Sequence, residues 1–386
     1  MRLLHTADLH LGKKVNGFNL LEDQRFVLRQ IVNLVKTQKP DALLIAGDLY
    51  DSGYPPEGAV SLLDDFLTEL ASLKCETYII SGNHDAARRL AFASKLLDTQ
   101  GIHFITSLEQ SLKAQIISDK QGKSLALFSL PYFTYLDAQR LLNDHFENMQ
   151  EATEALLAQI REDKSQADLR VLMAHLFVTY AGTRPETSDS ERINLGTIEN
   201  VDASLFEDFD YCALGHVHRP QKIYKDTIRY SGSPLMYSFS ELGPQKHLVQ
   251  IDFDEACLPK LSFHPLLPLH EMRQIKGYLK EVIAQTESEE SASRQDYVQV
   301  ILRDEFEPHG ALDTLRELYP NLMILSFDNK RTQAMGAQSS MDRELKEADY
   351  LKLFEEFYAE QNGMDLSAYQ KDVVKESYNQ AVNGKV

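Results

Sequence analysis

The stretch Thr77-Tyr78-Ile79-Ile80-Ser81-Gly82-Asn83-His84-Asp85 organises the rest of the chain. Its first four residues form an apolar run that is typical of a buried strand, and the polar group Ser81–Asp85 follows directly. A helical segment is predicted to begin near Ala86. In α/β folds, functional side chains stand just beyond the carboxyl ends of strands, so this stretch predicts both the fold class and the place of a site.

Other apolar runs along the chain also end in side chains of the metal-ligand type. Asp8 and His10 follow residues 2–6, Asp48 follows Ala42–Ala46, His175 follows Arg170–Ala174, and Gly215-His216-Val217-His218 follows Tyr211–Leu214. Taken singly, each group has an ordinary explanation as a turn, a cap or a core histidine. Five such strand ends in succession are not expected by chance, because the remaining seven histidines show no such placement.

The chemistry of these side chains indicates metal-assisted hydrolysis. Oxygen and imidazole ligands without thiolates suit Mn²⁺, Fe²⁺ or Zn²⁺ better than Ca²⁺. Cys75, Cys212 and Cys257 lie far apart without a CxxC pair, which argues against a thiolate zinc site and a disulfide framework. Two ions about 3.5–4 Å apart stabilise the attacking and leaving oxygens of a displacement at phosphorus. The sequence therefore predicts a two-metal site that hydrolyses phosphoesters.

Length and composition limit the class of protein. A chain of 386 residues, 43% of them hydrophobic, can bury a substantial core and exceeds the usual size of one compact domain. The net charge of −18 argues against a nucleic-acid binder that is basic over its whole surface, but not against a nucleic-acid enzyme. We find neither the basic start of a signal peptide nor the roughly 18 apolar residues of a membrane span, so a soluble intracellular protein is expected.

The order of predicted elements indicates an α/β layered fold of two sheets flanked by helices. One helix is predicted over residues 86–99, and a hairpin region over Ile102–Ile105, Ala114–Ser118 and Ser124–Leu130. The runs Thr227–Tyr230, His247–Phe253 and Lys260–Phe263 are predicted to close the second sheet. Residues 181–196 are polar and rich in turn residues, so a long surface loop is expected there.

We expect four parts along the chain. Residues 1–265 would form the main domain, 266–330 a small α/β capping domain, 331–341 a linker, and 342–386 a helical tail. The tail contains two amphipathic helix candidates, Arg343–Gln361 and Leu366–Ala381. Their apolar faces need a groove, either on their own domain or on a partner.

The order of motifs DxH, GDxxD, GNHD, a lone His and GHxH resembles the signature of the calcineurin-like metallophosphoesterase family. The opening MRLLHTADLHLGK (residues 1–13), the segment AGDLYDSGYPP (residues 46–56) and the C-terminal extension are similar, more narrowly, to the SbcD family of bacterial nuclease subunits. The likeness covers nearly the whole chain and is strongest up to about Asp254.

This resemblance implies a role for each matching residue. One metal would be held by Asp8, His10 and His218, the other by Asn83, His175 and His216, and Asp48 would bridge the two. His84 would be no ligand; it would contact the scissile phosphate and help to protonate the departing 3′ oxygen, with Asp85 as its orienter. Archaeal and eukaryotic relatives carry a histidine three positions after the bridging aspartate, where this chain has Asp51, so a phosphate contact there does not carry over.

The resemblance also implies an activity and partners. It implies a DNA nuclease with two divalent metal ions, Mn²⁺ by expectation and Mg²⁺ as the alternative. Such an enzyme degrades double-stranded ends 3′ to 5′ and cuts hairpins or blocked ends in DNA repair, recombination and replication. Its partners would be DNA, an SbcC-like coiled-coil ABC ATPase bound by the C-terminal helices, and a second copy bound through N-terminal-domain helices such as Leu62–Leu73. The location would be cytoplasmic and nucleoid-associated, without a membrane contact.

Several alternatives stay open at this point. Lys13, Lys14, Arg88, Arg89 and Arg219 flank the motifs and are candidates for DNA phosphate contacts, although solvated surface explains each equally well. A small-substrate phosphodiesterase or phosphatase of the same family would need the same ligands but not the tail. A non-catalytic scaffold on a degenerate version of the fold is disfavoured by the intact ligand set.

Overall fold

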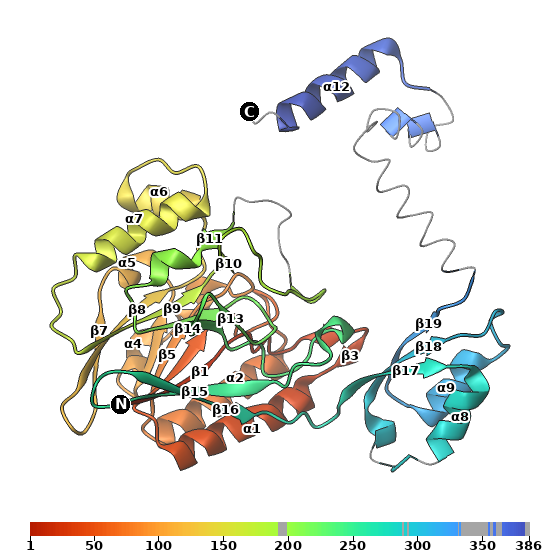
Figure 1. The fold of residues 1–386 in the computed structure, drawn as a ribbon, viewed down its shortest axis with the longest axis horizontal. Coiled ribbons are helices and arrows are strands. Elements are labelled where there is room, and N and C mark those ends of the chain that lie inside the picture. Colours follow the sequence, from red (N-terminus) through yellow and green to blue (C-terminus); the bar gives the residue numbers. More distant parts are fainter. Residues whose placement is uncertain are drawn as a thin grey trace. The chain divides into compact units, whose positions relative to one another are not determined.

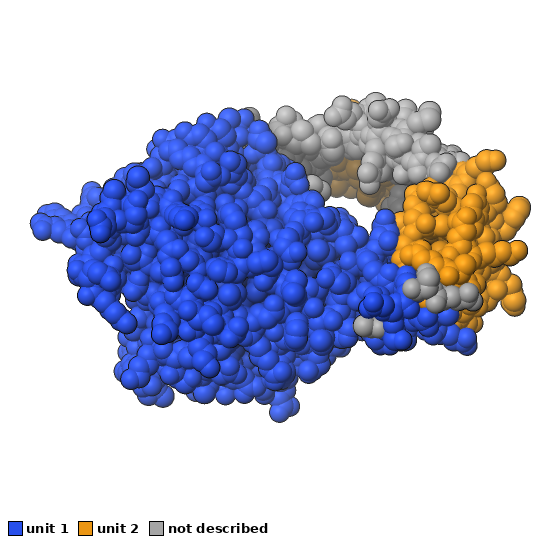
Figure 2. Space-filling model, turned by 60° about the horizontal axis from the view of Figure 1, so that its bottom comes forward, with its two compact units in different colours: residues 1–274, 289–299, 316–324 blue, residues 275–288, 300–315, 325–386 orange. Residues whose placement is uncertain are grey.

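The computed structural model describes residues 1–191, 199–287, 289–291, 293–330, 332, 354–355, 358–359 and 365–382. The chain forms two compact units, which Figure 2 colours separately. Unit 1 comprises residues 1–274, 289–299 and 316–324, and unit 2 comprises residues 275–288, 300–315 and 325–386. The division of the chain at residues 265, 330 and 341 stays a prediction.

The first sheet of unit 1 has the strand order β16-β15-β1-β4-β5-β6. Its strands are β1 (Arg2–Thr6), β4 (Ala42–Ala46), β5 (Glu76–Ile80), β6 (Ile102–Ile105), β15 (His247–Phe253) and β16 (Pro259–Pro265). β1, β4, β5 and β6 run parallel, β15 pairs antiparallel with β1, and β16 pairs antiparallel with β15. Every residue of β4 is buried, which explains its uninterrupted apolar sequence.

The second sheet of unit 1 has the order β13-β14-β12-β9-β8-β7. Its strands are β7 (Gln115–Ser118), β8 (Ser124–Leu130), β9 (Leu169–His175), β12 (Tyr211–Gly215), β13 (Gln221–Ile223) and β14 (Lys225–Tyr230). The four central strands run parallel, and β7 and β13 are antiparallel edges. Parallel order places the carboxyl ends of β9 and β12 side by side, because Gly215 is paired with His175.

Helices cover the outer face of each sheet, as Figure 1 shows. α1 (Leu21–Gln38) and α2 (Glu57–Ser72) pack on the first sheet. The second sheet is covered by α5 (Leu108–Ser111), α6 (Tyr135–Leu142) and α7 (Met149–Arg161). Between the sheets lies a third apolar cluster that includes Leu44, Val171 and Ala213. The predicted layered α/β fold of two sheets flanked by helices is confirmed.

Two strand assignments differ from the sequence prediction. The sequence predicts β6 in a hairpin region with β7 and β8, but β6 is the fourth parallel strand of the first sheet. It also predicts that β15 and β16 close the second sheet, but they extend the first sheet through β1. An apolar run indicates that a strand is buried but not which strand lies next to it. Strand pairing depends on contacts between residues that are far apart in the sequence.

The single helix predicted over residues 86–99 is interrupted. The structure has α3 (Ala87–Leu90) and α4 (Ser94–Asp98), with Ala93 between them in a left-handed conformation. Leu90 is buried, whereas Phe92 and Leu96 are 83% and 69% exposed. Most helical stability in proteins comes from packing an apolar face. A continuous helix over residues 86–99 would therefore gain little stability, because two of its large apolar side chains are exposed.

The remaining elements are shorter or lie in the C-terminal third. The strands β17 (Met272–Gly277), β18 (Tyr297–Leu302) and β19 (Leu322–Phe327) form a three-stranded sheet, and α8 (Leu279–Glu287) and α9 (Ala311–Leu318) accompany them in the chain. The sequence did not predict β17 or α8. The short elements of unit 1 are β2 (Lys14–Val15), β3 (Phe18–Asn19), β10 (Val178–Thr179), β11 (Val201–Asp202), η1 (Ala203–Phe206), η2 (Phe239–Glu241) and η3 (Ser293–Gln295).

The tail is described only in part. α12 (Ala368–Val382) corresponds to the second predicted tail helix, while most of the helix predicted over Arg343–Gln361 and of the linker predicted over 331–341 lies outside the described residues. A search of the described helices finds none that is long and apolar enough to cross a membrane.

Candidate metal centre

Side chains from both sheets meet where their parallel strands end. The backbone N–H of Asp8 donates to the carbonyl of Gly47 at 3.0 Å, which joins the segments after β1 and β4. The backbone N–H of His216, after β12, donates to the Asp8 carboxylate at 3.0 Å. A Cβ on Gly215 would lie 1.8 Å from the carbonyl oxygen of Ala46, so only glycine allows β12 to approach β4 this closely.

Four of the predicted site residues have backbone conformations that side chains rarely adopt. The φ angles of Asp8, His10, Asp48 and His216 are 56°, 45°, 49° and 103°. A left-handed conformation costs about 1–2 kcal/mol for a residue with a Cβ. Non-glycine residues at such positions point to a requirement for their side chains, as is common at functional sites.

The first ligand group consists of Asp8, His10 and His218. Their ligand atoms all lie within 4.8 Å of one another, and the three side chains are buried. The Nε2 atoms of His10 and His218 face each other at 2.9 Å. The arrangement brings together one carboxylate and two imidazole nitrogens, and their assignment as ligands of one metal stays a prediction.

The second ligand group is centred on Asn83. Its Oδ1 lies 3.0 Å from Nε2 of His175 and 3.0 Å from Nδ1 of His216. The Oδ2 atom of Asp48 lies 3.4 Å from Nε2 of His175 and 3.6 Å from Nε2 of His10. Asp48 is therefore within reach of both groups, which is the position that a bridging carboxylate requires.

His84 stands at the edge of these groups. Its Nδ1 lies 2.8 Å from the carbonyl oxygen of Asp51, and its backbone N–H donates to Oδ1 of Asp48 at 2.9 Å. The imidazole meets the ring of His10 edge to face, with 4.8 Å between centroids. His84 is half-buried, so its ring combines a fixed orientation with access from solvent.

The contacts of Asp85 differ from those expected, in which its side chain would orient the His84 ring. Its carboxylate accepts hydrogen bonds from the backbone N–H groups of Leu49 (3.1 Å), Tyr50 (3.0 Å) and Gly82 (2.9 Å). It thus joins the loop after β4 to the loop after β5. The orientation of the His84 ring comes instead from the main chain of Asp51.

Asp51 lies behind His10. Its Oδ1 is 2.6 Å from Nζ of Lys13 and 3.4 Å from Nδ1 of His10. Burial opposes ionisation of this carboxyl, but His10 and Lys13 lower its pKa to about 2. The Asp51 carboxylate thus contacts the proposed ligand His10 at Nδ1, on the side away from its Nε2 atom. This role differs from the phosphate contact implied for the histidine that archaeal and eukaryotic relatives carry at this position.

The buried ionisable groups of the two ligand groups favour a bound cation. Burial raises the pKa of Asp8 to about 7, and burial lowers the pKa values of His10 and His216 to about 3. Burial also opposes the charge on His175, but the Asp48 carboxylate raises the pKa of His175 to about 9. Two carboxylates buried beside imidazoles form a donor set that divalent ions stabilise, and a bound ion would displace the proton of His175, so these residues fit two such ions.

The sequence did not reveal a group of residues that surrounds His218. The Oγ of Ser190 lies 2.7 Å from Nδ1 of His218 and 2.6 Å from Oε1 of Glu241. Glu241 forms a buried ion pair with Lys246 at 2.6 Å, and Glu191 accepts from the backbone N–H of His218 at 2.7 Å. These residues carry no motif, and Ser190 lies within the stretch predicted as a surface loop.

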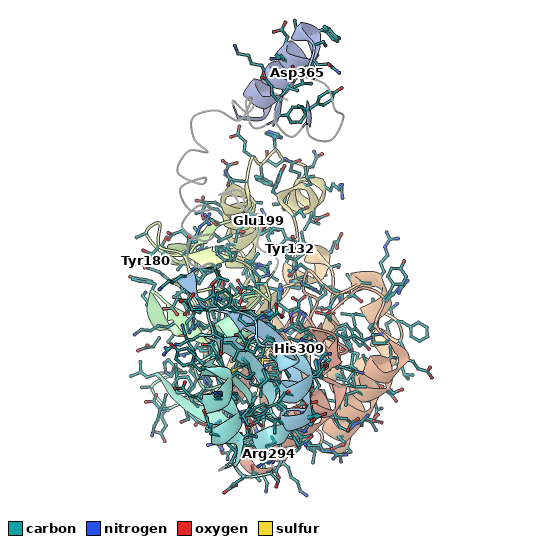
Figure 3. The ribbon with its side chains drawn as sticks, turned by 90° about the vertical axis from the view of Figure 1, so that its right-hand side faces the viewer. Tyr132, Tyr180, Glu199, Arg294, His309 and Asp365 are labelled. Carbon is teal, nitrogen blue, oxygen red and sulfur yellow. The ribbon has the colours of Figure 1, made fainter. Side chains whose placement is uncertain are left out.

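A small pocket lies next to the second ligand group. It has a volume of about 80 Å³, and His216 is one of its lining residues. Tyr132 and Glu199, labelled in Figure 3, also line it, together with Phe133 and Phe177. The proposed metal ligands are therefore bordered, on the His216 side, by a pocket that is lined mainly by aromatic side chains.

The basic residues near the motifs fall into two kinds. Lys13 is paired with Asp51, Arg219 lies 3.2 Å from Glu186, and the Arg89 guanidinium stacks 3.7 Å from the ring centroid of Tyr54. Lys14 and Arg88 are exposed at the surface. These last two are the better candidates for contacts with phosphates.

Comparisons with known proteins cover most of the chain. The family profile described as Calcineurin-like phosphoesterase matches residues 1–220, and that described as Type 5 capsule protein repressor C-terminal domain matches residues 268–362. A curated protein of Staphylococcus epidermidis, named as the SbcD component of the nuclease SbcCD, is 34% identical over 381 residues, which cover 97% of each chain. The solved structure of TT1561 from Thermus thermophilus aligns with a TM-score of 0.42 at 12% identity, over 69% of this chain and 99% of that chain.

Proposed function

Because the chain belongs to the calcineurin-like phosphoesterases, and among them to the SbcD nuclease subunits, we propose that it cuts DNA as the nuclease subunit of an SbcCD-like complex. As a member of this family it is a phosphodiester hydrolase that uses divalent metal ions. The observation that carries the proposal is the complete donor set at the ends of β1, β4, β5, β9 and β12.

Seven residues would hold two ions, of which Mn²⁺ is the expected kind and Mg²⁺ the alternative. Asp8, His10 and His218 would hold one ion, Asn83, His175 and His216 the other, and Asp48 would bridge them. The position of Asp48, 3.4 Å from His175 and 3.6 Å from His10, supports the bridge. When bound, such ions would neutralise charge on the phosphoryl oxygens and lower the pKa of a water molecule.

His84 would act on the leaving group. The carbonyl oxygen of Asp51 can only accept a hydrogen bond, so Nδ1 of His84 carries the hydrogen in that contact. A protonated ring would then give its Nε2 proton to the departing 3′ oxygen as the P–O bond breaks, and the ring would become neutral. His84 is half-buried and reachable from solvent, so the phosphate would enter from its side.

The proposed substrate is double-stranded DNA, degraded 3′ to 5′ from ends and cut at hairpins or blocked ends during repair and recombination. Support comes from the relative's name and from the profile match to residues 268–362. The partner would be a coiled-coil ABC ATPase that receives the tail. On α12, Tyr369 and Val373 are 78% and 44% exposed and lie one helical turn apart, which suits a groove on another protein.

A second copy of the chain remains a proposed partner. The segment predicted to contact it, however, packs inside its own domain. The apolar side chains of the predicted dimer face Leu62–Leu73 are buried on α2, where they pack against the first sheet and α1. A dimer would therefore use other side chains of the N-terminal helices.

The test is a nuclease assay with blunt, hairpin and protein-blocked duplexes, in Mn²⁺ or Mg²⁺, with and without a co-purified ATPase partner. We expect Mn²⁺-dependent cutting of all three substrates with the partner present. A chromogenic phosphodiester is assayed in parallel. Fast hydrolysis of that compound together with inert duplex DNA would favour a small-substrate phosphodiesterase, and a chain without bound metal in elemental analysis would favour a scaffold.

A further inference from the structure

His218 is backed by a chain of buried polar contacts, formed by Ser190, Glu241 and Lys246, that we name the His218 support. Ser190 Oγ lies 2.7 Å from Nδ1 of His218 and 2.6 Å from Oε1 of Glu241, and Lys246 Nζ lies 2.6 Å from Oε2 of Glu241. Glu241 and Lys246 are 1% and 4% exposed. Charged side chains at this depth are retained only with matched partners, so the pair defines a fixed carboxylate behind Ser190.

The directions of these hydrogen bonds follow from which atoms can donate. The Lys246 ammonium donates to Glu241, to the carbonyl of His218 at 2.8 Å and to Ser233 Oγ at 3.0 Å, which uses its three hydrogens. The hydroxyl of Ser190 has two neighbours that can accept its hydrogen, the Glu241 carboxylate at 2.6 Å and Ser188 Oγ at 2.7 Å. The carboxylate is the stronger acceptor and cannot donate, and Ser188 can donate its own hydrogen to Glu191, so the hydrogen of Ser190 points to Glu241. Ser190 Oγ must then accept from His218, which places the hydrogen of the neutral imidazole on Nδ1.

This hydrogen position determines which nitrogen of His218 is free to bind a metal. With Nδ1 protonated, Nε2 carries the lone pair, and Nε2 is the atom that faces Nε2 of His10 at 2.9 Å. The support differs from the neighbours of His175 and His10, because Nδ1 of His175 lies 2.8 Å from the carbonyl oxygen of Ala46 and Nδ1 of His10 lies 3.4 Å from the Asp51 carboxylate. A carbonyl or carboxylate fixes the tautomer by itself, whereas a hydroxyl does so only when a third group directs its hydrogen.

We propose that Ser190, directed by the Glu241–Lys246 pair, is a positioning residue that holds His218 in its metal-binding tautomer and thereby sets the affinity of one of the two metal sites. The proposal rests on the proposed function in one respect, the role of His218 as a ligand. Ser190 lies in the loop over residues 181–191, and the proposal concerns its hydroxyl hydrogen bond and not the position of the loop. The loop has a separate anchor, since the backbone N–H of Asp189 donates to Ser240 Oγ at 2.9 Å.

The test compares three variants of the full chain by titration of the metal-free protein with Mn²⁺. Ser190→Ala removes the acceptor for Nδ1, and we expect one of the two sites to bind about 10–100-fold more weakly while the other stays unchanged. Ser190→Thr keeps the hydroxyl and restores the affinity. Ser240→Ala removes the separate anchor of the loop without touching the His218 support, and both affinities stay at their original values.

A direct measurement accompanies the titration, which matters if Ser190→Ala folds poorly. Long-range proton–nitrogen correlation spectra of histidine-labelled metal-free protein report the tautomer of His218, and we expect the Nδ1–H form in the unmodified chain. The Nε2–H form, or equal Mn²⁺ affinities for Ser190→Ala and the unmodified chain, would overturn the proposal. So would an equal loss in Ser240→Ala, because the loop rather than the hydrogen bond would then be responsible.

Failure of the proposed function would look different. His218→Ala is expected to abolish one of the two Mn²⁺ sites. If it left both sites intact, the ligand assignment itself would be wrong, whatever the result at Ser190.

Discussion

Nδ1 of His84 lies 2.8 Å from the carbonyl oxygen of Asp51, so a main-chain group holds the ring of the proposed acid. The loop that supplies this carbonyl is held in turn by Asp85, which accepts from the N–H groups of Leu49 and Tyr50. Asp85 therefore acts on His84 through the backbone. In the proposed mechanism, His84 faces the leaving group and is not one of the seven proposed metal ligands.

His84→Gln is expected to lower kcat by about 10²–10⁴-fold, because glutamine offers no transferable proton. Metal content stays unchanged, since His84 is not among the seven proposed ligands. The measurements are cutting of linear duplex DNA at saturating Mn²⁺ and elemental analysis of the same sample. Full activity of the variant would remove His84 from the mechanism.

Asp85→Asn is expected to destabilise the chain by about 1–3 kcal/mol, because an amide NH₂ replaces a carboxylate oxygen that accepts backbone N–H groups. The loop that carries Asp51 loosens as well, so kcat falls. Urea unfolding and kcat are the two measurements. Asp226→Asn is the control, since Asp226 forms an exposed pair with Lys222 and its loss is expected to leave stability nearly unchanged.

Asp48→Asn is expected to reduce the metal content of the chain at both sites, because the neutral amide provides a single oxygen where a bridging anion is needed. The Oδ1 of Asp48 also accepts from the backbone N–H of His84 at 2.9 Å, and the asparagine oxygen can keep that contact. Gel filtration followed by elemental analysis measures the bound metal. Two tightly retained ions would show that Asp48 is no bridge.

Gly215→Ala is expected to cost about 3 kcal/mol or more of unfolding free energy, because the new Cβ would lie 1.8 Å from the backbone oxygen of Ala46. Gly122→Ala is the control for a Cβ that meets no neighbour: nothing lies within 4 Å of it, although its φ of +86° differs from the ordinary backbone of Gly215. That control has only a conformational cost of about 1–2 kcal/mol. Equal effects in the two variants would mean that β12 can move away from β4.

His5→Asn is expected to make the protein less sensitive to acid. Burial lowers the pKa of His5 to about 3, so below pH 6.5 the unfolded chain takes up a proton that the folded chain does not. Stability is therefore lost as the pH falls from 6.5 toward 3, by about 2 kcal/mol at pH 5.

Asparagine can keep the 3.0 Å contact that Nδ1 of His5 makes with the Tyr211 hydroxyl, and it does not titrate. Unfolding free energies of both chains at pH 7.5 and pH 5 give the comparison. A difference between the chains that does not change with pH would contradict the expectation.

The amino-acid sequence determined much of this protein by itself. Apolar runs followed by Asp8, Asp48, Asn83, His175 and His216 predicted the strands and their buried character, because burial restricts the residue types of a strand. The same strand ends supplied the candidate ligands, whose assignment stays a prediction. The helical spacing of the apolar residues before Pro40 can likewise be read from the sequence, and the structure has α1 at Leu21–Gln38. These features depend on local spacing, and local spacing can be read along a chain.

Only the tertiary structure decided which sheet β6, β15 and β16 join, since pairing depends on partners far away in the sequence. It also decided that Asp51 rather than Asp85 holds the ring of His84, and that Ser190, Glu241 and Lys246 stand behind His218. A hydrogen bond needs only a donor and an acceptor at the right distance. Many polar residues meet that requirement in a sequence, and the folded chain alone selects the pair.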